Sequence, residues 1–62
     1  MIVTMRHVRE ARYCARGARQ FFKRHNLDWR AFIAHGIDEK ELIATGDAMA
    51  QFVVEVAHGV KR

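Results

Sequence analysis

The amino-acid sequence predicts a small all-α domain, a bundle of two long helices and one short helix. Three observations favour this class: capping residues precede apolar runs, residues that tolerate a left-handed backbone follow them, and apolar residues recur at spacings of three and four. The 62 residues have room for one domain, which spans residues 1–62. Half of them are hydrophobic, which is enough for one core and argues against a wholly disordered chain.

Helix starts are indicated by a capping residue that is flanked by two apolar residues able to pack on each other. The expected caps are Thr4, Asp28 and Asp38. The third start carries the strongest signal, because Glu41 adds the carboxylate of a capping box to Asp38.

Helix ends are indicated by residues that tolerate the left-handed conformation in which helices commonly terminate. These residues, each preceded by a histidine, are Asn26, Gly36 and Gly59. Together with the starts, they predict helices over residues 5–25, 28–35 and 38–58. An alternative stays open at Gly46, which could end one helix while Asp47 caps a new one, so that four helices would form.

Two apolar stripes support the long helices. The first comprises Val8, Ala11, Ala15, Ala18, Phe22 and His25, and Cys14 and Phe21 widen it. The second comprises Leu42, Gly46, Met49, Val53, Val56 and Val60. Since the first stripe is rich in small residues, we expect the two helices to face each other closely, with Phe22 and Phe52 in the core. Leu27 and Trp29 are expected to fill the turn between them.

Basic residues are the most unusual feature of the first predicted helix. On a continuous helix that turns about 100° per residue, five of them fall within a sector of roughly 80°, opposite the alanine face. We call this set the arginine stripe: Arg9, Arg12, Arg16, Arg19 and Lys23. Neighbours one turn apart, such as Arg12 and Arg16, repel each other, so the stripe does not stabilise the helix. It is therefore the predicted partner-binding site.

Charge is also unevenly distributed along the chain. Residues 1–30 carry eight Lys or Arg against two acidic residues, a net +6, whereas residues 31–62 carry three against five, a net −2. Arginine suits bidentate contact with carboxylate or phosphate, so the first half is expected to attract an anionic partner. The alternative interpretation is a solvated face that is partly neutralised by Asp38, Glu39 and Glu41.

No catalytic, cofactor-binding or metal site is predicted. The chain has no serine, no glycine-rich phosphate loop and no HExxH motif. Three histidines, His25, His35 and His58, stand in the last turn of a predicted helix, where the helix dipole favours positive charge. The single cysteine, Cys14, is expected to be a small core residue of a cytoplasmic protein. No signal peptide and no apolar run of about 18 residues is present, so no membrane association is expected.

Short segments along most of the chain carry a resemblance to known proteins. They are residues 13–22 (YCARGARQFF), 27–29 (LDW), 36–37 (GI) and 44–50 (ATGDAMA). These segments resemble small uncharacterised proteins of tailed bacteriophages and prophages. The resemblance implies a phage or prophage context, and it implies no activity and no functional residues.

Two functions are open for such a domain. The favoured one is a small non-enzymatic protein-binding adaptor or accessory protein, which docks on an acidic protein surface through a helical face and the arginine stripe. The alternative is a small basic nucleic-acid-binding protein that contacts the phosphate backbone through the first helix. A homodimer is also left open.

Overall fold

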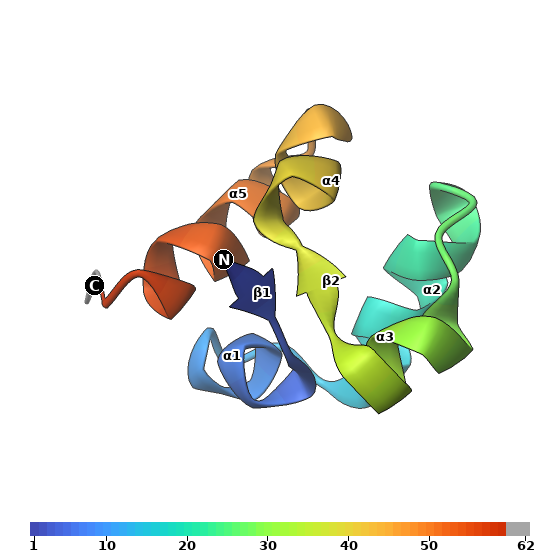
Figure 1. Ribbon diagram of the computed structural model, residues 1–62, viewed down its shortest axis with the longest axis horizontal. Helices are drawn as coiled ribbons and strands as arrows, with labels where there is room; N and C mark the ends of the chain where they lie inside the picture. The colour runs from blue at the N-terminus through green and yellow to red at the C-terminus, as the bar shows by residue number, and fades with distance from the viewer. Residues whose placement is uncertain (60–62) are drawn as a thin grey trace.

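The structure, a computed structural model, describes residues 1–59 and is mostly helical (Figure 1). The elements in chain order are β1 (Ile2–Val3), α1 (Met5–Glu10), α2 (Ala15–Arg24), α3 (Trp29–His35), β2 (Ile37–Asp38), α4 (Glu39–Ala44) and α5 (Ala48–Ala57). The predicted helical character is confirmed. The predicted bundle of two long helices and one short helix is only roughly compatible, because the described residues form five shorter helices.

The first predicted helix, over residues 5–25, is wrong because the chain breaks after α1. The end of α1 is a Schellman motif, in which the Tyr13 N–H donates to the Val8 carbonyl (3.1 Å) and the Arg12 N–H donates to the Arg9 carbonyl (2.9 Å). Arg12 occupies the left-handed position of this motif with φ 67°. Glycine or asparagine usually fills that position, so an arginine there gives no signal of a helix end.

Cys14 starts the next helix. Its Sγ accepts a hydrogen bond from the Gly17 N–H at 3.3 Å and so caps α2. Cys14 and Ala15 are both exposed, so their predicted places on the buried stripe are wrong. Cysteine is not among the preferred capping residues, so this helix start has no recognisable signal in the sequence.

The other predicted helix starts and ends agree with the structure. Thr4, Asp28 and Asp38 are the N-caps of α1, α3 and α4. The three predicted terminators have positive φ: Asn26 58°, Gly36 80° and Gly59 89°. The capping box is wrong, because Glu41 makes no hydrogen bond back to Asp38 among the described residues. Val60, expected on the second stripe, lies outside the described residues.

The break at Gly46, left open by the sequence, is present. Gly46 has φ 71°, and α4 and α5 lie on either side of it. The Thr45 hydroxyl donates to the Leu42 carbonyl (2.7 Å) and accepts the Asp47 N–H (3.2 Å). Asp47 then caps α5 by accepting the Met49 N–H at 2.8 Å. Thr45 thus connects the end of one helix to the cap of the next.

A two-stranded antiparallel sheet joins the start of the chain to its middle, so the predicted all-α class is wrong in this detail (Figure 1). Ile2 pairs with Asp38 and Val3 with Ile37. Gly36 permits this pairing, because a Cβ at its position would lie 2.5 Å from the Ile2 Cγ2 and 2.8 Å from the Val3 carbonyl oxygen. Strands of two residues are too short to show the alternation by which strands are recognised.

Every element contributes to one core. Its buried residues are Val3, Val8, Ala11, Ala18, Phe21, Phe22, Phe32, Ile37, Leu42, Ala50, Val53 and Val54. Phe22 is buried as predicted, whereas Phe52 is half-buried and lies edge-on to Tyr13 at 6.1 Å between ring centroids. The two long predicted helices do not face each other along their length: α5 packs on α1 and α4, while α2 packs on α1 and α3.

Asp47 also links α5 to the end of α2. Its Oδ2 lies 3.4 Å from the Arg24 Nη2 and 3.6 Å from the His25 Nε2. The pKa of Asp47 lies below its ordinary value of 3.8, chiefly because its carboxylate accepts the Met49 N–H, with His25 and Arg24 adding to the effect against a smaller opposing desolvation. The ionised form of Asp47 is therefore the one that the fold prefers.

Because Arg12 has a positive φ, replacing it with glycine should stabilise the fold, whereas glycine usually destabilises a helix. Arg12→Gly should raise the free energy of unfolding by up to about 1 kcal/mol, because glycine adopts positive φ without the steric cost of a Cβ. In a continuous helix the same change would lower stability by about 1 kcal/mol. Urea denaturation distinguishes the two signs, and Arg12→Ala, which keeps the Cβ, is the control.

Asp47 predicts a pH dependence of stability. Because its folded pKa lies below its unfolded pKa, the carboxylate stabilises the fold above about pH 4, and this contribution disappears as the pH falls through the folded value. Asparagine is also a good N-cap, so Asp47→Asn removes the charge and keeps the cap. The melting temperature of the variant should lie below that of the parent near neutral pH, and the two should converge in acid. A constant difference across this range would contradict the assignment.

Candidate functional site

The arginine stripe is not a continuous row, because the helix that was expected to carry it is broken. Arg9 lies on α1, Arg12 lies in the left-handed turn, and Arg16, Arg19 and Lys23 lie on α2. All five side chains are exposed. The prediction that the five basic residues share a sector of roughly 80° assumes one continuous helix, so it holds only for the three residues on α2. We call these three residues the α2 basic face.

The amphipathic pattern of α2 turns this face outward. Ala18, Phe21 and Phe22 are buried and fix the inner side of the helix. Arg16, Arg19 and Lys23 follow one another at spacings of three and four on the opposite side. The first and last of them are separated by about 10.5 Å of helical rise, so the three charges form one short row.

Acidic side chains of the described residues do not neutralise this row. The ion pairs within residues 1–59 join Glu39 to the N-terminal amine and His58, and Asp47 to Arg24 and His25. None of them involves the α2 basic face. The alternative interpretation placed Asp38, Glu39 and Glu41 beside the stripe, but Glu39 instead lies 2.6 Å from the His58 Nε2. The cations of the α2 basic face are therefore solvated and unpaired within residues 1–59, whereas Arg24 on the same helix lies beside Asp47.

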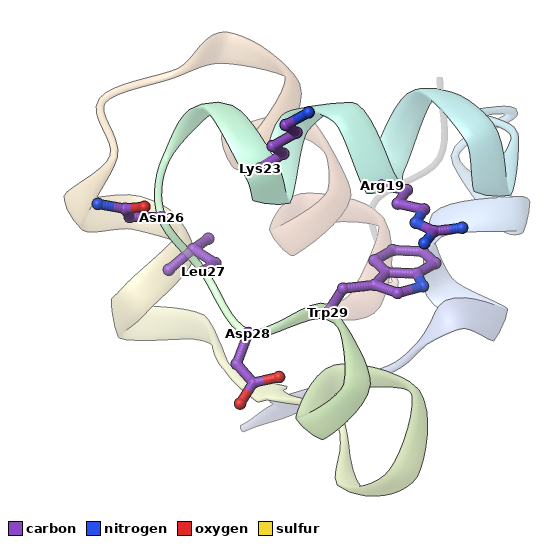
Figure 2. Close-up of a pocket in the computed structure, with 6 residues that line it drawn as sticks. All are labelled: Arg19, Lys23, Asn26, Leu27, Asp28 and Trp29. Atoms are coloured by element: carbon purple, nitrogen blue, oxygen red, sulfur yellow. The ribbon is translucent and has the colours of Figure 1, made fainter.

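An open groove of about 430 Å³ lies where α2 meets the start of α3 (Figure 2). Six residues line this α2–α3 groove: Arg19, Lys23, Asn26, Leu27, Asp28 and Trp29. Arg19 and Lys23 come from α2, and the other four come from the turn and the first residue of α3. Figure 2 shows the Arg19 side chain extending toward the indole of Trp29. The groove thus adjoins the α2 basic face and shares two residues with it.

Trp29 forms a fixed apolar wall of the groove. Its ring lies edge-on to Phe22 at 5.4 Å and is tilted against Phe32 at 5.5 Å between centroids. Both neighbours are buried, while Trp29 and Leu27 are half-buried and line the groove. Since core aromatics hold the indole, its orientation does not depend on a ligand.

The polar residues of the groove have different surroundings. Asp28 caps α3, and its Oδ1 accepts the Ala31 N–H at 3.0 Å. Asn26 has φ 58° at the end of α2, and its side-chain amide makes no hydrogen bond within the described residues. The groove therefore combines two cations, one carboxylate, one open amide and an apolar wall.

Part of this site is predicted by the sequence. The spacing of Arg19 and Lys23 predicts that both face solvent, whereas Leu27 and Trp29 are expected only in a turn. The signal that points to the groove is their order in the chain: a helix terminator at Asn26 is followed at once by Leu27, a cap and Trp29. Because the chain reverses direction at Asn26, Leu27 and Trp29 lie beside α2, which carries the basic side chains.

Other kinds of site have no counterpart in the described part of the chain. No three His, Cys, Asp or Glu side chains within residues 1–59 come together as a metal ion would require. None of the helices in that range combines the length and apolar character needed to cross a bilayer.

Comparisons with known proteins do not place the chain in a family. No family model, no curated protein and no solved structure matches it. The resemblance to small proteins of phages and prophages, and the expected absence of catalysis, therefore stay predictions from the sequence.

Proposed function

We propose that this protein is a small non-enzymatic binding module that docks on an acidic surface of another protein through the α2 basic face. The observation that supports this function is a row of three exposed cations on one helix, none of them in an ion pair within residues 1–59. An origin in a phage or prophage belongs to the same proposal, and it rests on the sequence resemblance.

The three cations of the α2 basic face add little to the stability of the fold, which favours a role in binding. Arg19 and Lys23 are like charges one turn apart, which costs an isolated helix about 0.2–0.5 kcal/mol. The three side chains add little to stability, since each is solvated. The same row raises the local concentration of an anionic partner and offers its arginines for bidentate contact with carboxylates.

A protein partner fits the surface better than a nucleic acid does. The break at Arg12 reduces the continuous row from five cations to three, which shortens any track for a phosphate backbone. The neighbouring groove adds the carboxylate of Asp28 and the apolar surface of Leu27 and Trp29. A mixed surface of this kind is typical of protein interfaces, in which tryptophan and arginine are enriched.

Nucleic-acid binding is the second candidate, because the net charge of +4 attracts any polyanion. It predicts contacts spread over all basic residues and a steep loss of affinity with salt. The proposed protein docking predicts instead that the α2 basic face contributes more than basic residues elsewhere.

Two variants with equal charge test the proposal. The first replaces Arg16, Arg19 and Lys23 with glutamine, and the second replaces Arg6, Arg9 and Arg30, which are also exposed. Each lowers the net charge by three. With labelled polyglutamate as the probe in fluorescence anisotropy, the first variant should lose about tenfold in affinity and the second much less, at unchanged thermal stability.

The same anisotropy measurement on a double-stranded DNA oligonucleotide tests the nucleic-acid function. Equal losses for both variants would show that charge acts without a site. Tighter binding of the DNA than of polyglutamate at matched salt would favour the nucleic-acid function.

A further inference from the structure

We propose that the α2–α3 groove receives an acidic peptide segment that carries one large apolar side chain. The inference rests on the proposed function and deepens it, because it names the part of the partner that enters the site. The apolar side chain would lie on Trp29 and Leu27, and the acidic residues beside it would reach Arg19 and Lys23.

Trp29 and Leu27 offer the peptide an exposed apolar surface. Trp29 is held by Phe22 and Phe32, so little conformational entropy is lost when a side chain packs on the indole. The volume of about 430 Å³ lies within the range of about 300–1,000 Å³ that ligand sites span. The groove is open, which suits a segment of chain better than an enclosed small molecule.

The basic residues beside this apolar surface are complementary in charge to an acidic segment. Arg19 and Lys23 border the apolar wall, and Arg16 continues the row one turn further along α2. Carboxylates on either side of an apolar residue would meet these cations with charge-assisted hydrogen bonds. The Asn26 amide, which has no partner among residues 1–59, offers a donor and an acceptor to the peptide backbone.

Asp28 distinguishes a peptide from a nucleic acid. Its Oδ1 accepts the Ala31 N–H, and the carboxylate is exposed on the groove wall. A phosphate backbone carries a negative charge at every nucleotide and would be repelled there. A peptide can place a backbone N–H beside Asp28 and keep its carboxylates on the side of Arg19 and Lys23.

A second groove of about 380 Å³ carries no such complementarity. It is lined by Tyr13, Ala48, Met49, Gln51, Phe52 and Glu55, with no basic side chain among them. Phe52 and Glu55 also make contacts of their own. An acidic segment would therefore choose the α2–α3 groove.

Trp29 is the single tryptophan of the chain, so its fluorescence reports directly on the groove. The probe is the blocked peptide Asp-Glu-Phe-Glu-Asp, which contains no tryptophan and one large apolar side chain. A matched peptide replaces Phe with serine at the same charge, and an oligothymidylate strand serves as the nucleic acid. The acidic apolar peptide should change the Trp29 emission and bind about tenfold more tightly than the serine peptide.

Matched variants locate the binding. Leu27→Ser should weaken the acidic apolar peptide about tenfold, whereas Ile33→Ser, at an exposed apolar residue outside the groove, should leave it unchanged. Should Leu27→Ser fail to fold, the comparison of the two peptides on the parent protein tests the apolar contact, and Arg19→Gln compared with Arg9→Gln tests the charged contact. Asn26→Gly keeps the left-handed backbone and removes only the amide, so it should fold and bind more weakly.

Three outcomes would overturn the inference. Equal binding of the serine peptide would show that charge alone acts, and the α2 basic face would then keep its proposed function without the groove. Stronger binding of oligothymidylate at Trp29 would assign the groove to nucleic acid. Binding of polyglutamate that depends on α2, with no Trp29 response to the acidic apolar peptide at millimolar concentration, would place the docking site outside the groove.

Discussion

Phe22 packs between α2 and α3 and supports the groove that lies between these helices. The side chain is 2% exposed and contacts the rings of Trp29 and Phe32, so it joins α2 to α3. Its backbone carbonyl accepts the Leu27 N–H at 2.8 Å, which ends α2 and turns the chain back. One residue therefore both terminates the basic helix and holds the indole beside it. The α2–α3 groove is the surface consequence of this core contact, which is why its apolar wall needs no ligand to form.

The turns show which parts of the fold the sequence could predict. Asn26, Gly36 and Gly46 tolerate positive φ at low cost, and their helix breaks could be predicted, at Gly46 as one of two alternatives. Arg12 adopts the same conformation, in which the Tyr13 and Arg12 N–H groups donate to carbonyls of the preceding helical turn. This arrangement does not follow from the conformational preference of arginine. The short sheet was missed for a related reason: its two strands pair across more than thirty residues of chain, and their two-residue length leaves no local pattern.

The candidate site divides in the same way. Arg19 and Lys23 could be predicted because the periodicity of one helix sets which residues face outward. Arg9 and Arg12 were grouped with them only because the helix was expected to continue. Trp29 could not be assigned to the groove from sequence, since its position beside Arg19 results from the reversal at Asn26 and from contact with Phe22. The spacing of residues along one helix thus predicts which basic side chains face solvent. The contact of Trp29 with Phe22, which places an apolar wall beside them, is a tertiary contact that spacing does not predict.

The candidate site depends on Trp29 as a fixed wall beside the α2 basic face. Nuclear Overhauser effects between the indole of Trp29 and the ring of Phe22 test this position, because they need the two rings in lasting contact. We expect strong cross-peaks from the indole to Phe22 and Phe32 and a single side-chain conformation of Trp29 in the protein without a partner. An indole that averages rapidly between conformations and shows no cross-peak to Phe22 would contradict it.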